Sequence, residues 1–422
     1  MDVTVSALGA LSALAIAIIL ILKKVPPAYG MVAGALIGGL IGGVDITNTV
    51  ALMMQGAKDI IPAVLRIMAA GILAGVLIES GAASSIAETI VKKLGEARAL
   101  LALSIATMIL TAVGVFIDVA VITVSPIALA IAKRAKFSKS AILLAMIGGG
   151  KAGNIMSPNP NAIAASDAFG VPLTSIMAAG IIPAVFGLAV TYFFAKKLIQ
   201  KGSAVVGQDI EATDQTQHPL FLTALIAPLV TIVLLALRPL FNINIDPMVA
   251  LPVGGIIGAI AMKKTKKIND YAISGLNKMS GVAIMLLGTG TLAGIIANSA
   301  LKDVVINALG SSGLPAYLLA PVSGIFMSAA TASTTAGTAV ASTVFSSTIL
   351  GLGVSALAGA AMIHAGATVL DHLPHGSFFH ATAGSVNMDI KERLKLMPYE
   401  SLVGLTLAVI STLVFGVFKL FG

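Results

Sequence analysis

The feature that most constrains this chain is a series of long apolar runs that recurs from one end to the other. Many approach the ~20 residues that an α-helix needs to cross the hydrocarbon core of a bilayer. Only 10% of the residues are charged, and the mean hydropathy is +1.02. The first run, Val5–Leu22, lacks a preceding basic residue and a following small-residue cleavage site, which favours a retained span over a signal peptide. The sequence therefore predicts an all-α polytopic membrane protein.

Composition and motifs narrow the class of function. The chain has no cysteine, which excludes disulfides and thiolate metal sites. The pattern G-x-x-x-x-G-K-[ST] is absent, which argues against an ATP-driven pump. The net charge of +8 is explained by basic loops on the cytoplasmic face, so no nucleic-acid partner is expected.

Two halves of the chain repeat the same order of apolar runs, residues 1–198 and residues 219–422, joined by a polar linker at 199–218. Short matches support a duplication. Met31-Val-Ala33 corresponds to Met248-Val-Ala250, and Leu73-Ala-Gly75 corresponds to Leu292-Ala-Gly294. Each half is expected to hold about five transmembrane helices, a re-entrant hairpin and a broken helix. The helix breaks are expected near residues 148–161 and 364–380, where Gly, Pro and polar residues interrupt the apolar runs.

Positive charge predicts the orientation of the two halves, because cytoplasmic loops carry an excess of lysine and arginine. Counting crossings from Lys23-Lys24 as a cytoplasmic pair places every basic cluster inside and both termini outside. The clusters concerned are Lys92-Lys93, Lys133–Lys139, Lys196-Lys197, Lys263–Lys267 and Lys391–Lys395. The first half then starts outside and the second inside, so the repeats are inverted, an architecture typical of secondary transporters.

Two apolar runs, Ala99–Lys133 and Leu314–Leu350, begin and end on the same side by this count. Each is either a pair of full crossings or a single re-entrant hairpin. We favour hairpins, whose tips near Asp118–Ser125 and Ser328–Thr335 would enter from opposite faces and meet at mid-depth.

Polar residues at 154–161 and near the second hairpin tip are candidates for substrate binding. Amide and hydroxyl groups can recognise a carboxylate or a hydroxyl, and helix-start amides favour an anion. Capping of a loop and packing of small residues are the structural alternatives. The residues concerned are Asn154, Ser157, Asn159 and Asn161 in the first half and Ser328, Thr331, Ser333, Thr334 and Thr335 in the second.

Charged and titratable residues in the apolar runs are candidates for coupling, because such groups are costly within a membrane and mark pathways. Lys151 would either neutralise a substrate carboxylate or extend to the membrane interface. Asp118 would carry a proton or form a structural ion pair. Asp371, His372 and His375 would form a proton relay, or a polar turn at the membrane surface.

Four segments resemble the gluconate permease family of the ion transporter superfamily. They are Phe116-Ile-Asp-Val119, Pro126-Ile-Ala-Leu-Ala-Ile-Ala132, Ser157-Pro-Asn-Pro-Asn-Ala-Ile-Ala164 and Thr368-Val-Leu-Asp-His-Leu-Pro-His-Gly-Ser-Phe-Phe379. The resemblance covers nearly the whole chain. It departs from the gluconate carriers at Ser157–Asn161, where they have a histidine- and proline-rich motif, and at Pro374-His375, where Asn-Asp is more usual.

The resemblance implies a secondary active transporter, not an enzyme, in a bacterial-type inner membrane. It would import a small organic hydroxycarboxylate such as gluconate or 3-hydroxybutyrate with protons. It needs no cofactor beyond the gradient, and its partners are the substrate, the lipid bilayer and, by resemblance, a second copy in a homodimer. Sodium coupling, a channel and a membrane-embedded metalloenzyme are the alternatives. The metalloprotease pattern His-Glu-x-x-His is absent.

Overall fold

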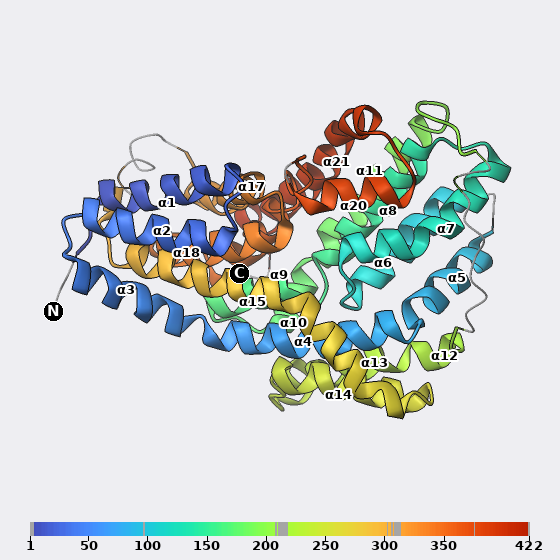
Figure 1. Ribbon diagram of the computed structural model, residues 1–422, viewed down its shortest axis with the longest axis horizontal. Helices are drawn as coiled ribbons and strands as arrows, with labels where there is room; N and C mark the ends of the chain where they lie inside the picture. Colours follow the sequence, from blue (N-terminus) through green and yellow to red (C-terminus); the bar gives the residue numbers. More distant parts are fainter. Residues whose placement is uncertain are drawn as a thin grey trace.

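The computed structural model describes residues 4–95, 98–206, 209, 218–301, 303–304, 307, 314–374 and 376–420, and within these it is almost wholly helical, with no β-strand (Figure 1). His375 and half of the predicted linker at 199–218 lie outside the described residues. The predicted all-α fold is confirmed. Helices α1–α3 lie at one end of the molecule and α5–α7 at the other, with α4 and α15 between them (Figure 1).

The chain begins with apolar helices whose starts follow ordinary capping chemistry. Ser6 and Asp45 each accept a hydrogen bond from a backbone N–H of the helix that follows, and Pro27 occupies the first position of its helix, where no N–H is needed. Gly81 has φ of +77° at the sharp entry into the fifth helix. These elements are α1 (Ala7–Leu22), α2 (Pro27–Ile41), α3 (Ile46–Asp59), α4 (Ile61–Glu79) and α5 (Ala82–Leu94).

The first helical hairpin is α6 (Ala99–Ala112) and α7 (Ile117–Ala135). Its tip is the turn at 113–116, so the tip predicted at Asp118–Ser125 is wrong. Gly114 adopts φ of +106° there, a conformation that the β-branched residues of the following stretch would not tolerate. Helix α6 has 14 residues, about 21 Å at ~1.5 Å per residue, which is short of the ~30 Å hydrocarbon core. That length favours a re-entrant hairpin.

A broken helix follows the hairpin. Helix α8 (Lys139–Asn154) ends at a non-helical segment, residues 155–159, which we call the first break, and α9 (Pro160–Phe169) resumes beyond it. All 16 residues of α8 are buried, so α8 is a central element of the core. Helices α10 (Leu173–Ala179) and α11 (Ile181–Lys197) complete this part of the chain.

The next group is dominated by α15 (Ile268–Ala297), a single helix of 30 residues. It packs along α2, α3 and α4. Glycines let the backbones of α3 and α15 approach closely, because a Cβ added to Gly56 would collide with the backbone of Gly290 and Gly294. The preceding elements are α12 (Phe221–Ala224), α13 (Ile226–Phe241) and α14 (Pro247–Ala261).

The last part of the chain contains a second helical hairpin and a second broken helix. The tip of this hairpin, at Ala332-Ser333, lies inside the predicted range Ser328–Thr335, and Ala332 has φ of +46°. The non-helical residues 367–374 and 376, after α19, are called the second break. The elements are α17 (Leu319–Thr331), α18 (Thr334–Gly351), α19 (Ala356–Gly366), α20 (Ser377–Ser385) and α21 (Ile390–Ser411).

Within the described residues, five apolar stretches of helix are long enough to cross a membrane by length and composition. Other apolar helices, such as α6, are shorter. A hairpin followed by a broken helix occurs in both parts of the chain, whereas the inverted orientation of two repeats stays a prediction. The five stretches are Ile61–Glu79, Leu173–Lys197, Phe221–Arg238, Thr265–Ala297 and Ile390–Val417.

Candidate functional site

Both hairpin tips and both breaks border one cavity of about 140 Å³. Asp118, in the first turn of α7, lines it from the first hairpin. Asn154 and Asn161 line it from the two sides of the first break, and Asp371 from the second break. Four segments that are far apart in the sequence therefore meet at one small, polar space.

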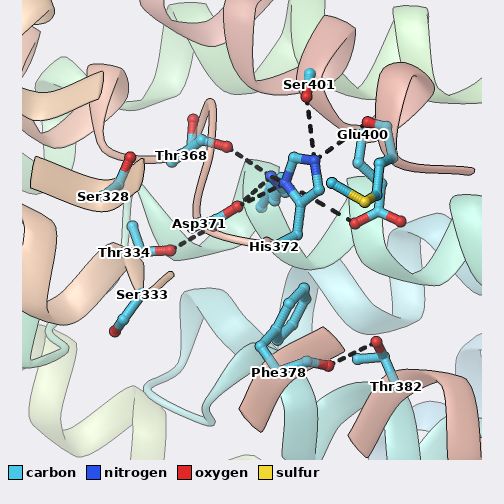
Figure 2. Close-up of polar contacts among 12 residues, drawn as sticks. Ser328, Ser333, Thr334, Thr368, Asp371, His372, Phe378, Thr382, Glu400 and Ser401 are labelled. Carbon is cyan, nitrogen blue, oxygen red and sulfur yellow. Dashed lines mark hydrogen bonds and ion pairs between the residues drawn. The ribbon is translucent and has the colours of Figure 1, made fainter. Parts of the chain in front are cut away.

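The tip of the second hairpin contributes three consecutive hydroxyl side chains to the lining, and each has a different role. Ser333 caps α18 by accepting a hydrogen bond from the Ala336 N–H at 3.2 Å. The hydroxyl of Thr334 donates to Asp371 Oδ2 at 2.5 Å, and that of Thr335 donates to Asn161 Oδ1 at 2.6 Å. The tip is thus bonded to both broken helices, and Figure 2 shows Thr334 directed at Asp371 while Ser333 points elsewhere.

Uncharged amides hold the first break. The amide nitrogen of Asn159 donates to the carbonyl oxygen of Asn154 at 2.8 Å and to its Oδ1 at 2.6 Å. The Asn159 Oδ1 accepts from the Ala162 N–H at 3.0 Å and so caps α9. The Nδ2 of Asn154 and the Oγ of Ser157 are buried without a hydrogen-bond partner among the described residues. Asn154, which lines the cavity, therefore has a free donor beside it.

An ion pair holds the second break, and its cation comes from α8. The Lys151 ammonium donates to Asp371 Oδ1 at 2.5 Å and to the Thr368 carbonyl oxygen at 2.5 Å, and lies 3.1 Å from His372 Nδ1. Lysine has three donors, and these contacts use them all. Lys151 is completely buried, so the alternative in which it extends to the membrane interface is wrong.

His372 joins this ion pair to a second one. Its Nε2 lies 3.1 Å from the Met397 carbonyl oxygen and from Ser401 Oγ. A carbonyl oxygen only accepts, so we assign the ring proton to Nε2. Nδ1 lies 3.1 Å from both the Lys151 ammonium and Asp371 Oδ1. In the neutral ring Nδ1 accepts from Lys151, which also donates to that same carboxylate oxygen. Glu400 Oε2 lies 4.0 Å from that Nδ1 and belongs to the fully buried Arg393–Glu400 pair. Figure 2 shows His372 between Asp371 and Glu400.

The structure divides the predicted site residues into two groups. Those that line the cavity are Asn154, Asn161, Ser333, Thr334, Thr335, Asp118 and Asp371. Those that do not are Ser157, Asn159, Ser328, Thr331, Lys151 and His372. The members of this second group that make hydrogen bonds or polar contacts with lining residues are Asn159, Thr331, Lys151 and His372. His375 lies outside the described residues.

Sequence reasoning missed several residues of the site. Phe116 and Phe378 line the cavity, and the Arg393–Glu400 pair lies next to His372. Arg393 and Glu400 belong to a charged stretch that looked like a loop at the membrane surface. Their opposite charges at a spacing of seven residues, two turns of helix, were the available signal for one shared face.

A second charged cluster ties α9 to the other helices. Arg66 of α4 donates from Nη2 to Asp246 Oδ2 at 2.6 Å and also pairs with Asp167 of α9. Asp246 caps α14, and the hydrogen bonds from Arg66 lower its pKa, against a smaller opposing effect of burial. This cluster positions the helix that follows the first break.

Comparison with known proteins gives a consistent result. A family model described as GntP family permease matches residues 5–418. An uncharacterized transporter of Haemophilus influenzae is 72% identical over 416 residues, which cover 99% of each chain. The high-affinity gluconate transporter of Escherichia coli is 23% identical over 93% of this chain and 95% of its own. The crystal structure of the Alcanivorax borkumensis YdaH transporter has the same fold, with a TM-score of 0.69 at 16% identity, covering 89% of this chain and 90% of that one.

Proposed function

Because the chain belongs to the GntP permease family, a family of membrane transporters and not of enzymes, we propose that it imports a small organic hydroxycarboxylate by proton symport. The proposed membrane is the bacterial inner membrane, with both termini extracytoplasmic. The proposed substrate site is the cavity between the two hairpin tips and the two breaks.

One observation supports the proposed coupling of substrate and proton. Two carboxyl groups, Asp118 and Asp371, line the same cavity as the neutral donors. A substrate carboxylate that enters beside them meets like charge, and like charge disfavours the ionised form of a carboxyl group. Substrate binding is therefore favoured when a proton neutralises a lining carboxyl group. An arrangement of this kind makes binding of the anion and of the proton mutually dependent.

The substrate class follows from the donors and from the size of the cavity. The hydroxyls of the second tip and the amides of Asn154 and Asn161 can bond both a carboxylate and a hydroxyl group. A volume of about 140 Å³ is small beside the roughly 300–1,000 Å³ of typical small-molecule sites. It favours a compact acid such as 3-hydroxybutyrate over gluconate.

Uptake by proteoliposomes tests the proposal. A panel of radiolabelled gluconate, 3-hydroxybutyrate, lactate and citrate is offered under an imposed pH gradient, a sodium gradient, or neither. We expect accumulation of at least one hydroxycarboxylate under the pH gradient. Asp118→Asn should abolish this accumulation yet spare exchange of substrate for substrate, because exchange needs no net release of a proton.

Asp45→Asn is the matched control, since Asp45 is an exposed cap of α3 far from the cavity lining and asparagine also caps helices. This variant should accumulate substrate as the wild type does. Accumulation driven by sodium alone, or an Asp118→Asn protein that still follows the pH gradient, would contradict proton symport through this site.

A further inference from the structure

The geometry points to a carboxylate exchange in which Asp371 occupies the position that the substrate carboxylate takes. Lys151 and Thr334 donate to Asp371 in the empty site and to the substrate carboxylate once it is bound. This inference rests on the proposed function, because it concerns how that site couples its two ligands. Protonation of Asp371 would release the donors, and the arriving anion would take them.

The contacts of Asp371 are those of a bound carboxylate. One oxygen accepts from the Lys151 ammonium at 2.5 Å and the other from the Thr334 hydroxyl at 2.5 Å. Asp371 and Thr334 line the cavity, whereas Lys151 does not. The carboxylate of Asp371 therefore stands at the wall of the cavity and keeps the lysine charge from the space beyond it.

The charge balance shows why a proton and an anion would need each other. The groups that face Asp371 are Lys151 from α8, His372 beside it, and Asp118 across the cavity. Those that face His372 also include the Arg393–Glu400 pair from α21. With His372 neutral and Asp118 protonated, the cations Lys151 and Arg393 balance the carboxylates Asp371 and Glu400.

A proton on Asp371 leaves this buried cluster with one uncompensated positive charge, which is costly away from water. An anion in the cavity removes that cost. Binding of the proton therefore strengthens binding of the anion, and binding of the anion strengthens binding of the proton by the same factor. Thr368 and His372 still hold Lys151 from behind. The lysine can therefore turn toward the cavity without leaving the cluster.

The test measures equilibrium binding of radiolabelled 3-hydroxybutyrate and gluconate to the purified protein, together with the protons taken up on binding, in weak buffer with an indicator dye. Wild type should bind more weakly as the pH rises and should take up protons with the anion. Asp371→Asn should still bind the anion, because the Lys151 charge no longer has a carboxylate partner in the protein. This variant should take up one proton fewer on binding.

Lys151→Met should weaken anion binding by roughly 10- to 150-fold, the range for loss of a hydrogen bond to a charged group. That variant leaves a buried carboxyl group without its cation, so it can fail to fold. The double variant Lys151→Met/Asp371→Asn buries no lone charge. It should fold and bind the anion weakly at every pH.

The outcomes separate this inference from the proposed function. Wild type that binds neither probe and takes up no protons argues against the proposed function. If wild type binds with proton uptake, the inference is overturned by any of three results. These are an Asp371→Asn protein with unchanged proton uptake, a folded Asp371→Asn protein that does not bind, and a double variant that binds as tightly as wild type.

Discussion

Both breaks interrupt a helix beside the cavity, but different chemical groups stabilise them. The first, at 155–159, is held by amides that bond to each other and to the start of α9. The second, which contains Asp371, is held by the Lys151–Asp371 ion pair and by His372. Amides keep one state across physiological pH, whereas a carboxyl group and an imidazole can exchange protons. The first break is therefore a fixed wall of the cavity, and the second is the wall whose charge can change.

The breaks are also connected. Lys151 belongs to the helix that leads into the first break, yet it supplies the cation for the second, 220 residues away in the sequence. Thr334 and Thr335, neighbours on one hairpin tip, each bond to a different break. A change of charge at Asp371 is thus transmitted to α8 and to the tip of the second hairpin, which are parts of the same cavity.

The largest effect is expected when the buried ion pair beside His372 loses one of its two members. Arg393→Met removes the cation from fully buried Glu400, and removal of one member of a buried ion pair costs about 3–5 kcal/mol. The free energy of unfolding in detergent measures this loss. The double variant Arg393→Met/Glu400→Met should recover most of it, because no lone charge remains buried. A double variant as unstable as the single one would mean that packing, and not charge, is what matters at this position.

A smaller effect is expected at the neutral break. Asn159→Ala removes the cap of α9, which costs about 0.5–2 kcal/mol of unfolding free energy. Asn159 does not line the cavity, so the substrate concentration for half-maximal uptake should stay near the wild-type value. Asn159→Ser, which retains a capping oxygen, serves as the control and should lose less stability. A large rise in that concentration with unchanged stability would place Asn159 in contact with substrate.

The smallest effect concerns the contact between the second tip and the first break. Thr335→Val removes the hydrogen bond to Asn161, worth about 0.5–1.5 kcal/mol, and should weaken apparent substrate affinity by roughly 2- to 10-fold. Thr343→Val on the same helix is the matched control, because its hydroxyl bonds only to the Ala339 carbonyl within α18. Equal effects of the two variants in uptake assays would show that the tip contact has no special role.

The sequence was sufficient for the fold class and for much of the site. Apolar runs predicted the helices, and Gly, Pro and polar residues near 148–161 and 364–380 located both breaks. The turn of the first hairpin was misplaced, because an apolar run with an internal Pro126 looks interrupted, although α7 accommodates that proline. The partners of charged residues could not be predicted. Lys151 with Asp371, and Arg66 with Asp167 and Asp246, are pairs that only the packing of distant helices brings together.

The length of α15 has a consequence for the membrane itself. Its 30 residues measure about 45 Å at ~1.5 Å per residue, well beyond the ~30 Å of an average hydrocarbon core. Packing along α2, α3 and α4 fixes its direction, so it cannot tilt independently of its neighbours. Asp270, Asn277 and Lys278 lie in its first three turns, and the apolar remainder, residues 279–297, measures about 28 Å at ~1.5 Å per residue, close to the hydrocarbon thickness. The polar turns extend beyond that thickness, so α15 meets the headgroup layer as well as the acyl chains.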